Sequence, residues 1–105
     1  MSQEVQDLRR KYQERISSEG MKTVTPGSHE HDQRQTRRGD AMAELLNEWD
    51  PVGHTVDEVR FVVGIPGQLK EDSLLYYFLT NYGGKAWEFK LEGGKVVEVE
   101  QLPIL

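Results

Sequence analysis

Hydrophobic positions along this chain follow two periods, a helical one in the first part and an alternating one in the last part. Near the N-terminus, apolar side chains recur at helical spacing between charged residues: Val5, Leu8, Tyr12 and Ile16. Gly20 interrupts this pattern. We therefore expect an amphipathic helix in residues 1–19.

Residues 20–39 do not continue the helical pattern. This stretch is polar and charged, its only apolar side chains are Met21 and Val24, and it contains the turn-forming pair Pro26-Gly27. Such a composition buries little apolar surface and is typical of a disordered segment. We expect a polar linker here, and a folded domain over residues 40–105.

Helical spacing returns after Asp40. Four apolar side chains share one face of the predicted helix: Met42, Leu45, Leu46 and Trp49. Pro51 disfavours helical geometry at the residue before it, so the helix should end there.

A second short helix is predicted after Gly53. Thr55 and Glu58 have the spacing of a capping box, in which each side chain bonds the other residue's backbone N–H. Gly64 suits a left-handed C-terminal cap, and Pro66 prevents the helix from continuing. The inward side chains of this helix are Val56, Val59, Val62 and Val63.

The last third of the chain alternates with the period of a β-strand. Strands are predicted at Ser73–Thr80, Lys85–Leu91 and Val96–Leu102, with glycine-containing loops between them. The expected fold is therefore α+β. Two short helices pack on a three-stranded antiparallel β-meander, and the N-terminal helix and linker precede them.

The lengths of the two loops set the strand register. A four-residue loop at 81–84 would place Phe78 opposite Trp87. A two-residue loop at Gly93-Gly94 would set Phe89 against a glutamate, whereas a three-residue loop sets it against Val97. Because a slip of one residue exchanges the two faces of a strand, the apolar pattern favours the three-residue loop.

This register gives the sheet two apolar faces, only one of which the short helices cover. The inner face contains Leu74, Tyr76, Phe78, Trp87, Phe89, Leu91, Val97 and Val99. The outer face contains Leu75, Tyr77, Leu79, Ala86, Glu88, Lys90, Val96, Glu98 and Glu100.

The outer face combines an apolar stripe with an acidic one, which is typical of a protein-binding surface. The predicted anchors are Leu75, Tyr77 and Leu79. The predicted acidic rim, which would steer a partner, is Glu88, Glu98 and Glu100. In the structural alternative, the N-terminal helix covers this surface, or a second copy buries it in a homodimer.

Composition narrows the class of partner. The chain has 105 residues, a formal net charge of -5 and a pI of about 5.2. This balance argues against nucleic acid and anionic membranes, which attract basic surfaces, and favours a basic protein partner.

The sequence also limits the chemistry and location that we expect. Without cysteine, the chain has no disulfide, thiolate nucleophile or Cys-ligated zinc. The N-terminal stretch lacks the apolar core of a signal peptide, and no apolar run reaches membrane-spanning length. We therefore expect a cytoplasmic protein that uses no cofactor.

Histidines are the remaining candidates for chemistry. His29 and His31 alternate with acidic residues and could ligate a metal, but a polar linker would not orient them. His54 lies near Asp50 and Asp57 in the sequence, which could suggest acid–base catalysis. No nucleophile accompanies it, so we expect neither a metal site nor an enzyme.

Three sequence stretches within residues 53–102 resemble a known family. "GHTVDEVRFVVGIPG", "LLYYF" and "GGKAWEFKLEGGKVVEVE" are similar to SmpA/OmlA lipoproteins and to the repeat of β-lactamase-inhibitor-protein-like folds. The resemblance implies a non-catalytic protein that presents its sheet and loops to a protein partner. It does not extend to the family's lipidated cysteine, because this chain has none.

A shorter stretch, "LLNEWDPVG" at 45–53, is similar to a motif of small bacterial immunity proteins. That resemblance implies a protein that neutralises a toxin by binding it, often with an acidic surface. We therefore expect a bacterial inhibitor or immunity-type protein that occludes a basic partner. A scaffold that self-associates through the same sheet face is the alternative.

Overall fold

The structure is a computed structural model that describes residues 2–16 and 27–103. Within them, three helices come first: α1 (Gln3–Ile16), α2 (His29–Glu48) and α3 (Val56–Val63). Four strands follow: β1 (Gln68–Leu69), β2 (Ser73–Thr80), β3 (Gly83–Glu92) and β4 (Lys95–Leu102). They form one antiparallel sheet in the order β1-β2-β3-β4. The predicted α+β class with an antiparallel sheet is confirmed, and β1 is a short additional strand.

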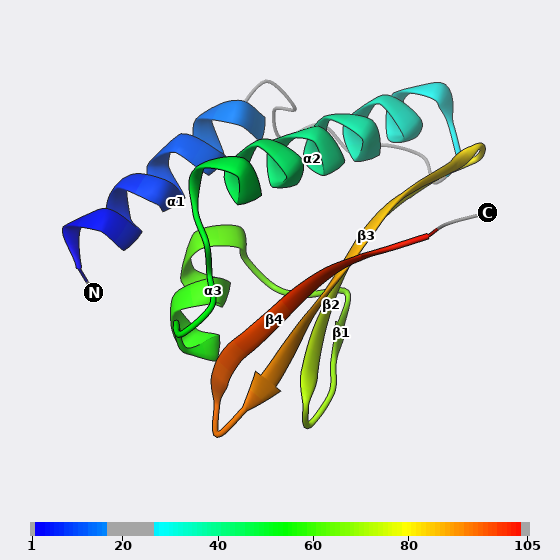
Figure 1. The fold of residues 1–105 in the computed structure, drawn as a ribbon. Coiled ribbons are helices and arrows are strands. Elements are labelled where there is room, and N and C mark those ends of the chain that lie inside the picture. The colour runs from blue at the N-terminus through cyan, green and yellow to red at the C-terminus, as the bar shows by residue number, and fades with distance from the viewer. Residues whose placement is uncertain (1, 17–26, 104–105) are drawn as a thin grey trace.

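The described helices lie on the inner side of the sheet (Figure 1). α2 crosses β2 and β3, whereas α1 packs against α2 and α3. Large, fully buried side chains come from both layers: Val5, Met42, Leu45, Val59, Val62, Leu74, Phe89 and Val96. One hydrophobic core therefore lies between the helices and the inner face of the sheet.

Helix α1 belongs to this core. Its buried side chains are Val5, Leu8 and Tyr12, as the helical spacing predicts. At its last turn, Arg15 Nε lies 3.1 Å from the Glu44 carboxylate and Nη2 lies 2.7 Å from that of Glu48, both on α2. Residues 17–19 of the predicted segment lie outside the described residues. Because α1 packs on the other helices, it does not cover the outer face of the sheet.

The predicted linker is wrong from His29 onward, where α2 begins. The Ser28 hydroxyl accepts a hydrogen bond from the His31 N–H at 3.1 Å and so caps the helix. The first turn also contains Glu30 and Asp32, whose negative charges interact favourably with the positive end of the helix dipole. The polar composition reflects a largely solvent-facing helix rather than a chain without structure. Residues 20–26 lie outside the described part.

The capping box of α3 is confirmed. Thr55 Oγ1 accepts from the Glu58 N–H at 3.2 Å, and the Thr55 N–H donates to Glu58 Oε1 at 3.1 Å. Gly64 ends the helix with φ 87 and ψ -161. The positive φ favours glycine, but this ψ lies outside the left-handed helical cap that the sequence suggested.

The three-residue loop predicted between β3 and β4 is wrong. Gly93 and Gly94 alone form the loop, with φ 60 and 79. These positive values match a two-residue hairpin turn whose twist suits the flanking strands, and glycine adopts them without steric cost. The register then shifts between Lys90 and Leu91, so that Val97 becomes an extra residue in β4.

This β-bulge exchanges two valines relative to the prediction. Val96 pairs with Leu91 and is 1% exposed on the inner face, whereas Val97 is 47% exposed. Beyond the bulge, Val99 lies opposite Phe89, and it packs against the core from the inner face to which the sequence assigned it. The bulge thus corrects the slip that a two-residue loop would otherwise have caused.

The hairpin between β2 and β3 also turns on two residues, Asn81 and Tyr82, rather than on four. Phe78 consequently lies opposite Lys85, and Tyr76 lies opposite Trp87. The register differs from the predicted one by two residues, and the side-chain period of a strand is also two. Each residue of β2 therefore keeps its predicted face.

Replacing Val5 with alanine tests the packing of α1. Because Val5 is fully buried, we expect the free energy of unfolding to fall by about 1–3 kcal/mol, measured by urea unfolding. Lys11→Ala, at an exposed position of the same helix, is the control and should change it by less than about 0.5 kcal/mol. Equal stability of Val5→Ala and the wild type would contradict this placement.

Candidate functional site: the outer face of the sheet

The outer face of the sheet is the candidate site, because the helices of the described chain all pack on the opposite face. Two rows of paired residues cross it. In one row, Ala86 on the central strand β3 lies between Tyr77 and Leu102. In the next, Glu88 lies between Leu75 and Glu100. Apolar side chains therefore continue across the face beside acidic ones.

Tyr77 is held in position by the segment that precedes β1. Its ring lies against Gly67, and its hydroxyl donates a hydrogen bond to the Gly67 carbonyl oxygen at 3.2 Å. A Cβ at position 67 would overlap the ring, so this approach requires glycine. Tyr77 nevertheless remains 43% exposed, as does Leu79. The site thus presents an aromatic side chain that already packs against Gly67 and donates a hydrogen bond to it.

The acidic residues of the face are partly neutralised by a lysine. Glu88 lies directly opposite Glu100, an arrangement of like charges that destabilises a strand pair. Lys90 Nζ lies 3.2 Å from the Glu100 carboxylate and 3.4 Å from that of Glu98. Its hydrogen bond to Glu100 and the charge of that group raise the pKa of Lys90 above its usual value.

The charge that remains on this face is negative. These contacts are exposed to solvent, where ion pairs are weak and screened by salt. Three glutamates against one lysine leave two net negative charges on the face. An approaching cationic group would still be attracted.

The structure brings the six predicted site residues onto one face. Leu75 and Glu88 are half-buried, whereas Tyr77, Leu79, Glu98 and Glu100 are exposed. Val96 does not belong to this face, because the β-bulge turns it inward. Sequence reasoning missed Leu102, which extends the apolar row, although the alternation of Glu98 and Glu100 points to it. It also missed the contact between the Tyr77 ring and Gly67, because no periodic pattern includes Gly67.

His54 has different partners from those suggested by its sequence neighbours. Its Nδ1 lies 3.0 Å from Glu58 Oε2, and its ring centroid is 5.1 Å from that of Trp49. Asp50 instead accepts the backbone N–H of Val52 at 3.0 Å, and Asp57 is exposed in the first turn of α3. His54 therefore supports the start of α3 rather than an acid–base pair with either aspartate.

The two candidate metal-ligating histidines lie in the first turn of α2. His29 and His31 are two residues apart on a helix, so their side chains point to different sides. Gln33 Nε2 lies 3.0 Å from His29 Nε2. Over the described residues, we find no group of three or more His, Cys, Asp or Glu side chains that could hold a metal ion.

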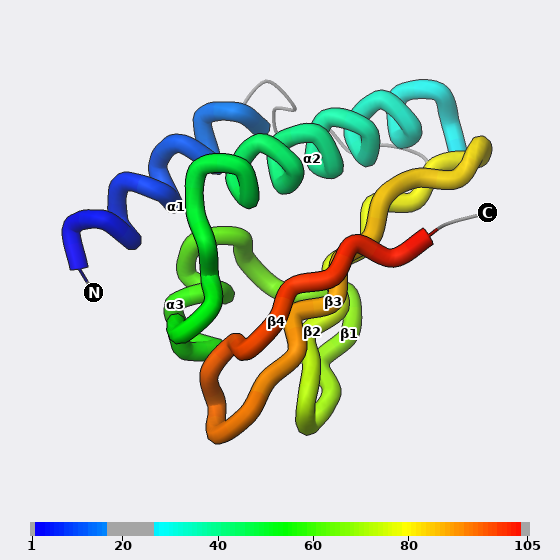
Figure 2. The backbone as a smooth tube through the Cα atoms, in the orientation of Figure 1, coloured from blue at the N-terminus to red at the C-terminus, as the bar shows by residue number. Residues whose placement is uncertain are grey.

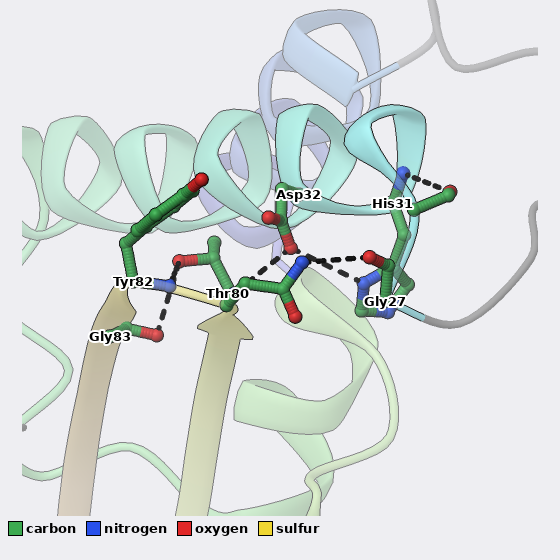
Figure 3. A network of polar contacts seen from close by, with 8 residues as sticks. Gly27, His31, Asp32, Thr80, Tyr82 and Gly83 are labelled. Atoms are coloured by element: carbon green, nitrogen blue, oxygen red, sulfur yellow. Dashed lines mark hydrogen bonds and ion pairs between the residues drawn. The ribbon is translucent and has the colours of Figure 1, made fainter.

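This end of α2 instead fastens the β2–β3 hairpin (Figure 3). The Asn81 N–H donates to Asp32 Oδ1 at 3.1 Å, and the Asn81 side chain donates to the Gly27 carbonyl oxygen at 2.7 Å. The neighbouring Tyr82 is 96% exposed. An open hollow of about 790 Å³ adjoins this network, and Arg15 and His29 are among the residues that line it.

Comparisons with known proteins give no relative: no family model, curated protein or solved structure matches this chain. Across residues 2–16 and 27–103, the helices are too short or too polar to cross a membrane. The outer face must therefore be interpreted from its own geometry.

The hydrogen bonds that the Glu58 carboxylate accepts make stability depend on pH. The Thr55 backbone hydrogen bond, followed by the hydrogen bond from His54, holds the pKa of Glu58 below its usual value. Ionised Glu58 therefore stabilises the fold above the usual carboxyl pKa, and this contribution is lost as pH falls through the lowered one. Glu58→Gln keeps a capping side chain but loses the charge.

We accordingly expect Glu58→Gln to be less stable than the wild type at about pH 7, and the difference to shrink as pH falls below the usual carboxyl range. Urea unfolding of both proteins across this range measures it. Asp57→Asn, in the same turn but exposed, is the matched control. A stability difference that stays constant with pH would contradict the proposed role of the Glu58 charge.

Proposed function

We propose that this protein is a non-enzymatic binding module of bacterial origin that inhibits a basic protein partner by occluding it with the outer face of its sheet. The anchors are Leu75, Tyr77 and Leu79, and the charged rim is Glu88, Glu98 and Glu100. The proposal includes a cytoplasmic location, without a cofactor, nucleic acid or membrane.

The observation that carries this proposal is the fixed, half-exposed Tyr77 beside an acidic rim. Its ring is seated on Gly67, so little conformational freedom is lost when a partner packs against it. Aromatic side chains in such positions contribute much of the binding energy in protein interfaces. The net negative charge of the face accelerates encounter with a basic surface.

The resemblances seen in the sequence agree with this function. The SmpA/OmlA-like stretches of residues 53–102 contribute the sheet, and the immunity-protein-like motif at 45–53 contributes the end of α2 and the following turn. Both resemblances imply binding to a protein rather than catalysis. They remain part of the proposal.

A scaffold that self-associates through the same face is the second candidate. Its support is the apolar row from Tyr77 through Ala86 to Leu102, which a second copy could bury. The two functions differ in their dependence on salt. An interface with a basic partner weakens as ionic strength rises, whereas an apolar homodimer does not.

Replacing both Tyr77 and Leu79 with aspartate tests the proposal. Each side chain is 43% exposed, so the variant should fold. Affinity capture from a source-cell lysate with the wild type should recover a basic protein, whose binding weakens with added salt. We expect the variant to bind the recovered protein at least about a hundredfold more weakly, because it loses two anchors and introduces two charges.

The matched control places aspartate at Ile65 and Tyr82 in the same way. These side chains are 83% and 96% exposed but lie outside the outer face. This control should bind the partner as the wild type does. Sedimentation of the purified protein completes the test. A wild-type dimer that the Tyr77 and Leu79 variant converts to a monomer would favour the scaffold instead.

A further inference from the structure

Among residues 2–16 and 27–103, nothing pairs with part of the outer edge of strand β4. At its start, the Gly53 N–H donates to the Val96 carbonyl oxygen at 2.8 Å, and the Val96 N–H donates to the His54 carbonyl oxygen at 2.9 Å. Beyond Val97, β4 is the last strand of the described sheet, and Figure 2 shows its backbone running on along this edge. Unpaired N–H and C=O groups on such an edge can accept an added strand.

A groove with both apolar and polar walls lies beside this edge. Its volume is about 290 Å³, and its lining includes Trp49, Pro51, Trp87 and Val99. Trp49 ends α2, Trp87 lies on β3, and Val99 faces inward from β4. Asp50 also lines the groove and gives it an acidic margin. A side chain reaching inward from an added strand would therefore meet the exposed margins of two largely buried aromatic rings.

The two faces of β4 favour different side chains on an added strand. Glu98 and Glu100 point to the outer face, whereas Val99 between them points to the groove. Side chains of neighbouring strands alternate together, so those on the outer face would lie beside the two glutamates. The strand that fits is alternately basic and apolar.

Charge makes a second copy of this chain a poor occupant. If β4 paired antiparallel with β4 of another copy around Val99, Glu98 of each chain would lie opposite Glu100 of the other. Like charges directly opposite each other destabilise a strand pair, and Lys90 already engages both glutamates. A basic strand has no such repulsion.

We propose that β4 binds an extended segment of the partner by strand addition. The segment's lysine or arginine side chains contact Glu98 and Glu100, and its alternate apolar side chains enter the groove between Trp49 and Trp87. This inference rests on the proposed function, because it names the kind of segment by which a basic protein is recognised.

A synthetic peptide of alternating lysine and valine is the probe. The chain has two tryptophans, and both line the groove, so tryptophan emission reports its occupation directly. We expect the peptide to change the emission saturably, and more weakly as salt rises. Amide hydrogen exchange should slow along β4, because an added strand protects its outward N–H groups.

Three comparisons make the test specific. A peptide of alternating glutamate and valine, and one with its lysines and valines in separate blocks, should bind at least about tenfold more weakly. The protein variant with Glu98→Gln and Glu100→Gln should lose about tenfold in affinity. The matched variant with Glu30→Gln and Glu71→Gln, at exposed positions away from β4, should bind normally.

Equal binding of the alternating and block peptides, or unchanged binding to the Glu98 and Glu100 variant, would overturn strand addition. The variant with aspartate at Tyr77 and Leu79 separates this inference from the proposed function. It should bind the peptide normally while losing the captured partner. Loss of the partner without any peptide binding would leave the outer face as the binding surface and refute the role of the β4 edge.

Discussion

The β-bulge in β4 is the constraint on which the proposed binding surface depends. The two-glycine turn fixes the pairing of Glu92 with Lys95, and without a correction every later residue of β4 would face the wrong side. Val99 would then point to solvent, and Glu98 would point into the core opposite a buried aromatic ring. The extra residue, Val97, returns the later residues of β4 to their proper faces, but its own apolar side chain is left exposed. Bulges are common where a side chain must be redirected near a functional site.

The asymmetry of the sheet follows from the packing of the helices. The centre of the inner face is buried because α2 lies over β2 and β3 while α1 and α3 extend the helical layer beside it. The outer face receives nothing from these helices, and its apolar side chains are neither fully hidden nor freely exposed. Such a compromise is typical of surfaces that remain soluble alone and become buried in a complex.

The local signals in the sequence predicted most of the fold. The capping box of Thr55 and Glu58 and the period-two strands depend on neighbouring residues, and they appear where the sequence places them. The first half of α2 could not be recognised, because its polar face contacts solvent and the distant hairpin, and helical periodicity detects only apolar faces. The bulge also escaped prediction. The choice between a turn of two glycines and a loop of three residues depends on how β3 and β4 pair, which the local sequence does not show.

The candidate site was predictable to the extent that it follows alternation. The sequence placed Glu98 and Glu100 on the face of Tyr77 because the expected three-residue loop and the observed two-residue loop with its bulge give these residues the same face. The seat of Tyr77 on Gly67 and the groove between Trp49 and Trp87 needed tertiary contacts between segments far apart in the chain. No pattern within either segment encodes such contacts, which explains why the edge of β4 became visible only in three dimensions.

The hydrogen bonds between Asn81 and the start of α2 have a consequence for the stability of that end of the helix. They join residues that are 49 and 54 positions apart in the chain. The first turns of α2 bury few apolar side chains, so local helix propensity and this distant contact stabilise them. Closing so long a loop costs chain entropy before the contact is gained. The first turns of α2 therefore gain this stabilisation only in a chain whose β2–β3 hairpin is also in place.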